Sequence, residues 1–332
     1  MYTIKDVAKL ANVSVGSVSK YLNKNGNLKE KTKVAIQEAI ETLNYEPNIY
    51  AKGLKINKTD TVVLIIPSIW HPFFSELTFY IEKNLRLQNK KMILCNSEEN
   101  IENEIEFIKM ARQNKVDGII AVTYSNIDEY ISENLPVVSI DRFFSKKTGF
   151  VSSDNFNGGR LAAEKLVKLG CQNLLYVGHG SKFTNDTLDR RRGFEEYCKE
   201  NKINYEILYF SGEREKFERK VEETLDRKIS DKSLDGVFTD TDSHALYVLE
   251  ELEKREVSVP EKVQIIGFDG TKSSKREKIF LSTIRQNIEE IAKESVNMLI
   301  KIIDNRDEIE SKKIPVYFLQ GKTTKILKDL EN

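Results

Sequence analysis

Carboxylate and guanidinium side chains stand directly after apolar runs, or near the start of the helical patterns that follow them. These side chains are Asp141, Arg142, Arg190, Asp242 and Asp269. Carboxylates accept hydrogen bonds and guanidinium groups donate them, so such a set binds polyhydroxyl molecules through paired hydrogen bonds. The pattern therefore predicts a site for a sugar or a sugar-like metabolite. A network of structural ion pairs that contacts no ligand is the alternative interpretation.

Aromatic side chains follow the first apolar run of the same region, in the segment WHPFF (70–74). An aromatic ring can cover the face of a sugar or a base, so we expect Phe73 to line the site and Phe74 to lie half in the core. Trp70 is either a second platform or a surface residue. Arg191 and Arg192 leave open an anionic ligand such as a sugar phosphate, although surface charges explain them equally well.

The residues that catalysis or metal binding would need are scattered. His71, His179 and His244 lack the spacing of metal ligands, and the sequence contains neither a G-x-S-x-G elbow nor a G-x-x-x-x-G-K-[ST] loop. The three cysteines are far apart, which favours buried thiols over disulfides or a zinc site. We therefore expect a protein that is not an enzyme and that uses no cofactor or metal.

From residue 61 onward, continuous apolar runs alternate with helical patterns. Runs without polar alternation indicate strands buried on both faces, as in parallel sheets covered by helices, and the ligand of such a fold lies at the carboxyl ends of the strands. The pattern occurs in two series of similar length. Strands are expected at 61–67, 92–96, 118–123, 137–140, 151–153, 174–177, 207–210, 236–239 and 263–268, with a strand pair near 315–320, and helices at 73–87, 101–114, 127–133, 155–169, 189–201, 213–228, 243–255 and 288–303.

Residues 3–23 predict two short helices separated by a tight break. Ile4, Val7, Ala8 and Ala11 form one apolar helix face, and Ser14 can cap the second helix. Helices this short need a partner, which the pattern at 31–43 supplies. Three small helices, the second with a small polar and cationic outer face, are typical of a helix-turn-helix that reads the major groove.

The distribution of charge separates this N-terminal segment from the rest of the chain. Residues 1–58 contain ten lysines and five acidic residues, a net charge of +5, whereas the remaining 42 basic and 47 acidic residues give −5. A basic segment on an acidic body suits a nucleic-acid-binding head. No apolar run approaches the length needed to span a membrane, and the chain opens on a charged helix instead of a signal peptide, so we expect a cytoplasmic protein.

The head resembles the DNA-binding headpiece of the lac repressor family of bacterial transcription regulators. The resemblance lies in Thr3, Ile4, Asp6, Val7, Ala8, Ala11, Val13, Ser14, Val18, Ser19, Leu22 and Asn23, and continues in Leu43, Tyr45, Pro47, Asn48, Ala51 and Leu54. It extends along the body through VDGII (116–120), SIDR (139–142), SDNFNGG (153–159), RRGF (191–194), IIGFD (265–269) and LSTIRQ (281–286).

The resemblance implies a set of DNA contacts. Val15, Gly16 and Lys20 match base-reading positions, although lysine lacks the planar fork of the arginine usual at Lys20, and Val15 has core packing as an alternative role. Residues 49–54, within a hinge and linker segment at 47–58, match a hinge helix that orders on DNA, where Leu54 would wedge into the minor groove; a flexible linker is the alternative. Lys5, Lys29, Lys31 and Lys33 are candidates for phosphate contacts. The expected DNA-binding set is Thr3, Ser14, Val15, Gly16, Ser17, Lys20, Asn23, Asn48, Ala51, Lys52 and Leu54.

For the body, the resemblance implies a two-lobed core like that of periplasmic sugar-binding proteins, made of doubly wound parallel sheets. The expected domains are a headpiece at 1–46, a hinge and linker at 47–58, and a core at 59–332. One lobe would comprise about 61–158 and 288–316, and the other about 159–285 and 319–332, with three crossings between them. The expected effector contacts are Phe73, Phe74, Asp141, Arg142, Arg190, Asp242 and Asp269.

Together these features predict a sequence-specific DNA-binding regulator, a repressor of carbohydrate-utilisation genes, whose operator affinity is controlled by a sugar or sugar phosphate between the lobes. A small head gives limited affinity for one half-site, so we expect a homodimer on a near-palindromic double-stranded operator, with no membrane partner. Two alternatives remain at this stage, a regulator controlled by a protein partner and a solute-binding module.

Overall fold

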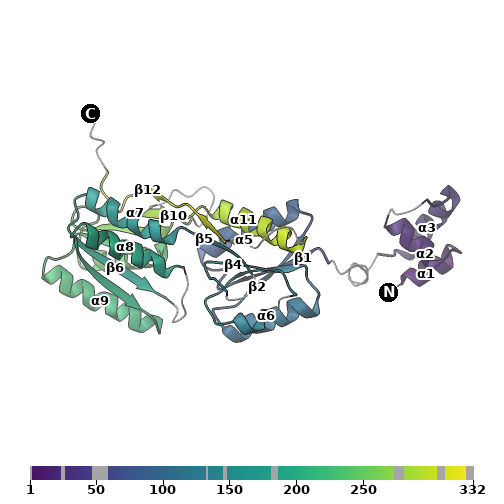
Figure 1. Ribbon diagram of the computed structural model, residues 1–332, viewed down its shortest axis with the longest axis horizontal. Helices are drawn as coiled ribbons and strands as arrows, with labels where there is room; N and C mark the ends of the chain where they lie inside the picture. The colour runs from purple at the N-terminus through teal and green to yellow at the C-terminus, as the bar shows by residue number, and fades with distance from the viewer. Residues whose placement is uncertain are drawn as a thin grey trace, which may run out of the picture. The chain divides into compact units, whose positions relative to one another are not determined.

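The computed structural model describes residues 2–23, 27–46, 59–131, 134–144, 148–180, 186–272, 280–304 and 311–326. The chain divides into two compact units, Met1–Thr59 and Asp60–Asn332, which we call the head and the core. Across the described ranges, every helix is too short or too polar to cross a lipid bilayer. Figure 1 shows the elements of each unit.

The head consists of α1 (Ile4–Leu10), α2 (Val15–Leu22) and α3 (Glu30–Leu43), as the sequence predicts. Their apolar faces meet in a small core of Val7, Ala8, Val18, Ile36 and Ala39. Thr3 and Asp6 form a capping box, and the Ser14 hydroxyl accepts a hydrogen bond from Ser17 N at 3.1 Å. Both helices of the helix-turn-helix therefore begin at side-chain caps. The predicted hinge helix at 49–54, with the rest of the segment 47–58, lies outside the described residues.

The first sheet of the core is parallel throughout, with the strand order β11-β5-β4-β3-β1-β2. The helices α5 and α11 pack on one face around Leu64, and α6 packs on the other face around Ile65. The strands are β1 (Thr61–Ile66), β2 (Lys91–Asn96), β3 (Gly118–Val122), β4 (Val137–Ile140), β5 (Gly149–Ser153) and β11 (Ser311–Ile314), and the helices are α5 (Pro72–Leu87), α6 (Ile101–Gln113) and α11 (Ile288–Ile303).

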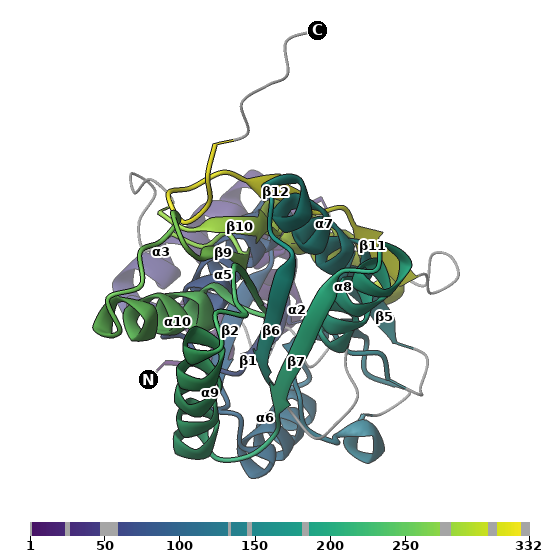
Figure 2. The same cartoon turned by 90° about the vertical axis from the view of Figure 1, so that its left-hand side faces the viewer.

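The second sheet has the order β12-β10-β9-β8-β6-β7 and is parallel except for β12, which runs antiparallel to β10. Figure 2 shows α9 and α10 on one face and α7 and α8 on the other, in agreement with the two buried clusters. The elements are α7 (Asn155–Lys168), β6 (Asn173–His179), α8 (Leu188–Glu200), β7 (Asn204–Phe210), α9 (Arg214–Ser230), β8 (Gly236–Thr239), α10 (Asp242–Lys254), β9 (Gln264–Asp269), β10 (Ser282–Arg285) and β12 (Tyr317–Leu319).

The chain passes between the sheets three times, after β5, after β10 and between β11 and β12. We call the layers around the first and second sheets the first and second lobes. Because all strands other than β12 are parallel within their sheets, the loops that follow them gather at the carboxyl edge of each sheet. These loops are the ones that carry the predicted ligand residues.

Two expected elements are corrected. Of the strand pair expected near 315–320, only β12 lies there; β11 ends at Ile314, before Pro315, and the two strands join different sheets instead of pairing. The helix expected at 127–133 is, in its described part, a single 3-10 turn at Asp128–Tyr130. Ile127 and Ile131 have helical spacing because both are buried, and not because a longer helix connects them. Strand β10 was not among the expected strands, since it is only four residues long and begins with two polar residues.

Candidate functional site

A cavity of about 660 Å³ opens among loops of both lobes of the core. Its size falls within the range of small-molecule sites, and its wall combines aromatic with charged side chains, as such sites do. The first lobe contributes His71, Phe73, Phe74, Glu99, Tyr124, Ser125 and Asp141, and most of the remaining wall comes from the second lobe, including Arg190, Asp240, His244 and Asp269.

Arg190 is the buried cation of this cavity, with 3% of its surface exposed. Its Nε donates to Asn155 Oδ1 at 2.8 Å, and its Nη1 donates to the Asp240 carbonyl at 2.6 Å. Nη1 also lies 3.6 Å from Asp269 Oδ1, and the guanidinium stacks 3.7 Å from the centroid of the Phe268 ring. These contacts fix the guanidinium in one orientation, so a ligand meets a preformed donor.

Asp269 ends β9 and is 3% exposed. Its Oδ1 accepts a hydrogen bond from Gln286 Nε2 at 2.6 Å, while Gln286 Oε1 accepts one from Ser153 Oγ at 2.5 Å. Since Ser153 belongs to the first lobe, Gln286 links the ligand site to a crossing between the lobes. Burial raises the pKa of Asp269 well above its usual range, and Arg190 opposes that increase.

Asp141 follows β4 and is 1% exposed. Its Oδ1 has no hydrogen-bond partner among the described residues, although it lines the cavity. Burial raises the pKa of Asp141 to about 6, and Arg190 again opposes the increase. Asp141 and Asp269 also hold positive backbone φ angles of 58° and 112°. Strained positions of this kind cluster at ligand sites, where the surrounding structure holds them.

Phe73 and Phe74 lie in the first turn of α5, and both line the cavity. Their exposed fractions are 4% and 8%, and their rings meet edge to face with centroids 5.3 Å apart. Both rings therefore belong to the core and to the cavity wall at once. Trp70 is 91% exposed and is not part of the wall.

Two of the predicted contacts do not line the cavity. Arg142 turns to Asp128, with Nη2 at 2.8 Å from Oδ2, and lies against the Phe144 ring. Asp242 opens α10, where its carboxylate accepts hydrogen bonds from Thr283 Oγ1 at 2.6 Å and Thr271 N at 2.9 Å. In both cases the side chain has local partners, and neither one lines the cavity.

Asp240 occupies the place that was expected for Asp242. It follows β8 directly, and its carboxylate accepts from His179 N at 3.0 Å and contacts His244 Nδ1 at 2.5 Å. The rule that ligands meet residues just after parallel strands would have selected Asp240 over the first residue of the next helix. All three histidines of the chain line the cavity, a grouping that their sequence spacing does not indicate.

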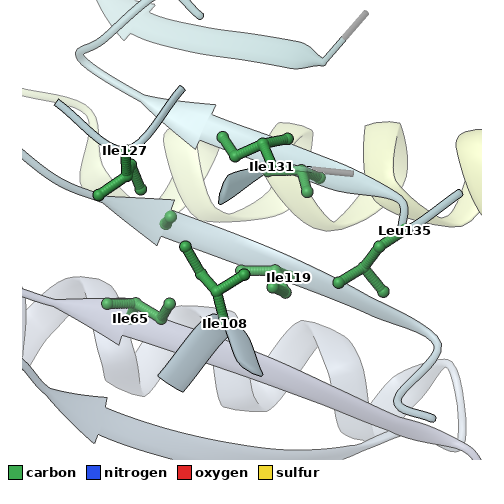
Figure 3. A pocket seen from close by; sticks show the side chains of 8 residues that line it. Ile65, Ile108, Ile119, Ile127, Ile131 and Leu135 are labelled. Atoms are coloured by element: carbon green, nitrogen blue, oxygen red, sulfur yellow. The ribbon is translucent and has the colours of Figure 1, made fainter. Parts of the chain in front are cut away.

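A second, apolar void lies inside the first lobe and has a volume of only about 10 Å³. Figure 3 shows Ile65, Ile108 and Ile119 pointing into it. It is no larger than one water molecule and has an almost wholly apolar lining, so we treat it as a packing defect and not as a binding site.

In the head, the predicted base readers share the outer surface of α2. Val15 is 41% exposed, and Lys20 and Gly16 are exposed as well, whereas Val18 points into the core of the head. Ser14, Ser17 and Thr3 stand at the helix starts and Asn23 at the end of α2. The other predicted DNA contacts, Asn48, Ala51, Lys52 and Leu54, lie outside the described residues.

Comparison with known proteins agrees with this architecture. Residues 3–48 match the model of bacterial regulatory proteins of the lacI family, and residues 163–324 match that of the periplasmic binding protein-like domain. The sucrose operon repressor of Streptococcus mutans serotype c is 35% identical, over 96% of this chain and 98% of its own length.

Solved structures show the same fold. A periplasmic binding protein/LacI transcriptional regulator from Alkaliphilus metalliredigens, in complex with D-xylulofuranose, is 29% identical and covers 80% of this chain and 100% of its own, with a TM-score of 0.72. The lac repressor dimer bound to operator and an anti-inducer is 19% identical and covers 97% of this chain and 99% of its own, with a TM-score of 0.82. From its sequence relatives and its fold, the chain belongs to the lacI family of bacterial regulatory proteins.

Proposed function

We propose that this protein represses carbohydrate-utilisation genes by binding operator DNA through its head, and that a sugar in the core cavity controls that binding. The names of its relatives support a sugar-operon role, and the neighbour that holds D-xylulofuranose supports a sugar in this fold. The observation that carries the ligand site is the buried Oδ1 of Asp141, which has no hydrogen-bond partner among the described residues, in a cavity wall that also holds the preformed guanidinium of Arg190.

The proposed ligand set is Phe73, Phe74, Asp141, Arg190 and Asp269, to which we add Asp240 and leave out Arg142 and Asp242. Sugar hydroxyls would donate to the carboxylates and accept from Arg190, while an aromatic ring covers an apolar sugar face. The histidines contact neighbours within the cavity wall, as His244 does with Asp240. We assign no reaction to this site, so the protein acts by binding and not as an enzyme.

On the DNA side, Val15, Gly16 and Lys20 would meet base edges, with Thr3, Ser14, Ser17 and Asn23 on the phosphates. Residues 47–58 would form a hinge in which Asn48, Ala51, Lys52 and Leu54 contact the minor groove. A homodimer on a near-palindromic operator would double the limited affinity of one head. Such a regulator works in the cytoplasm, where the DNA and the imported sugar meet.

The test is a binding measurement with the full chain and DNA fragments from its own gene region. The proposal predicts tight, sequence-dependent binding to at least one upstream fragment, and a change in that binding when a sugar is added. Equal, salt-sensitive adhesion to every fragment, with and without sugars, would overturn it, because phosphate contacts alone carry no sequence information.

A further inference from the structure

We propose that the cavity takes an uncharged polyhydroxyl ligand and excludes its phosphate esters. This inference rests on the proposed function and narrows the ligand class of the same site. It bears directly on the choice between a sugar and a sugar phosphate, which the sequence leaves open. Three features of the cavity support this inference: the charges of its wall, the partners of its cations, and the buried acceptor of Asp141.

The wall of the cavity carries more acid than base. Among the described residues that line it, five are carboxylates and two are arginines, namely Glu99, Asp141, Glu218, Asp240 and Asp269 against Arg190 and Arg214. A phosphate group brings up to two further negative charges at neutral pH. Placing like charges together in a partly buried site costs several kcal/mol, a penalty that an uncharged sugar does not meet.

Both arginines already have partners. Arg190 is shared among Asn155, Asp269 and the Asp240 carbonyl. Arg214 Nε lies 2.7 Å from Glu218 Oε1 at the outer part of the wall, where its side chain is 80% exposed. A phosphate would therefore compete with a carboxylate for either guanidinium.

His244 and His71 add no spare positive charge to the wall. His244 lies 2.5 Å from Asp240, so a proton gained there is neutralised by that carboxylate. Burial lowers the pKa of His71, which keeps this ring neutral at physiological pH. The extra arginines of the sequence also fail to reach the site, since Arg192 pairs with Asp189 at 2.6 Å and Arg191 lies over the Tyr209 ring.

Asp141 calls for a hydrogen-bond donor on the ligand. Its buried Oδ1 is an acceptor without a donor among the described residues, and leaving such an atom unsatisfied is costly. A sugar hydroxyl can donate to it, whereas a fully ionised phosphate can only accept. The ligand that completes this site is therefore rich in hydroxyl donors, and the acidic wall of the cavity disfavours one that also carries an anionic group.

The experiment is calorimetric titration of the full chain with matched pairs: D-ribose and D-ribose 5-phosphate, D-fructose and D-fructose 6-phosphate, and sucrose and sucrose 6-phosphate. We expect one of the uncharged sugars to bind, and its ester to bind at least about thirtyfold more weakly. An ester that binds as tightly as its parent sugar would overturn the inference and leave the proposed function standing. If none of these sugars and esters binds, and no other sugar does, then the inference and the proposed function both fail.

A charge-reversal variant supplies a second readout. Glu218→Lys adds a cation to the wall and releases Arg214. The ratio between the affinities for sugar and ester should therefore become about tenfold smaller. Glu223→Lys makes the same change of charge on the same helix at an exposed position outside the cavity, and should leave the difference unchanged. Equal discrimination in the two variants would contradict an electrostatic origin and with it the proposal.

Discussion

Glu76 and Arg285 form a two-point ion pair that joins the two lobes of the core. Arg285 Nη2 lies 2.6 Å from Glu76 Oε1, and Nη1 lies 3.2 Å from Oε2, with 14% and 21% of the side chains exposed. Glu76 stands on α5, next to the aromatic wall of the cavity, and Arg285 ends β10 at a crossing between the lobes. The pair therefore ties the lobes together beside the proposed ligand site.

We predict that Glu76→Gln changes sugar affinity several-fold without touching the ligand. The variant keeps the size of the side chain and leaves Arg285 without its counter-charge, at a cost of about 1–3 kcal/mol in the stability of this arrangement. Calorimetric titration and thermal unfolding measure the two effects. The control is Glu82→Gln, which breaks an exposed pair with Arg86 on the same helix and should change neither. Identical behaviour of the two variants would refute the prediction.

A second prediction concerns pH. Burial raises the pKa of Asp269 to about 7, so the folded state holds this proton more tightly than the unfolded chain does. The stability that follows from this is present at low pH and is lost as the pH rises from about 4 to about 7. Asp269→Asn cannot titrate, so its stability relative to wild type should increase over that range. Thermal unfolding of both proteins across this range measures the difference; a difference that does not depend on pH would be inconsistent with the assignment.

Sugar affinity should depend on pH in the opposite direction to the stability that Asp269 contributes. Sugar hydroxyls donate to ionised carboxylates, so binding favours the deprotonated forms of Asp141 and Asp269. Because burial raises the pKa of Asp141 to about 6 and that of Asp269 further, sugar affinity should increase as the pH rises from about 5.5 to about 8. Titration calorimetry at several pH values gives this dependence directly. Affinity that falls with rising pH would mean that the carboxylates bind the sugar in their protonated state.

The sequence allowed much of this architecture to be predicted because its signals are local. Continuous apolar runs reveal strands buried on both faces, and Thr3 with Asp6 reveals a helix start. The position of Asp269 after such a run was likewise visible. The partners of the side chains could not be read from the sequence. Arg142 pairs with Asp128 and Asp242 with Thr283, and only the folded chain brings these residues together. The same is true of Glu76 and Arg285, which are 209 positions apart.

A fourth prediction concerns Glu104. This buried carboxylate accepts a hydrogen bond from Thr123 Oγ1 at 2.6 Å and lies 3.4 Å from Ser97 Oγ, so it joins the loops after β2 and β3. Those loops carry Glu99, Tyr124 and Ser125 of the cavity wall.

Because its carboxylate ties these loops together, Glu104→Ala should destabilise the core by about 1–3 kcal/mol and weaken sugar binding about tenfold. Glu104→Gln retains an acceptor oxygen and should keep most of the stability of the core and most of the sugar affinity. Denaturant unfolding and calorimetry provide the readouts. Full sugar affinity in the alanine variant would exclude a positioning role for Glu104.

A fifth prediction separates base reading from phosphate contact in the head. Lys20 is exposed on α2, so Lys20→Ala should weaken operator binding by about 1–3 kcal/mol and relax specificity at one base pair. Lys33 stands in the first turn of α3, and Lys33→Ala should weaken operator and random DNA equally while reducing the salt dependence. Fluorescence anisotropy at several salt concentrations distinguishes the two. If both variants lost affinity for operator and random DNA equally, Lys20 would not be a base-reading residue.

The central claim is that occupancy of the core cavity and binding of DNA by the head are coupled. The direct test is the dissociation constant for operator DNA, measured by fluorescence anisotropy with and without a saturating sugar that calorimetry has shown to bind. The account predicts a change of at least about fivefold, and an equal change in sugar affinity when operator is present, because linkage makes the coupling reciprocal. Identical operator affinity in the two conditions would contradict it.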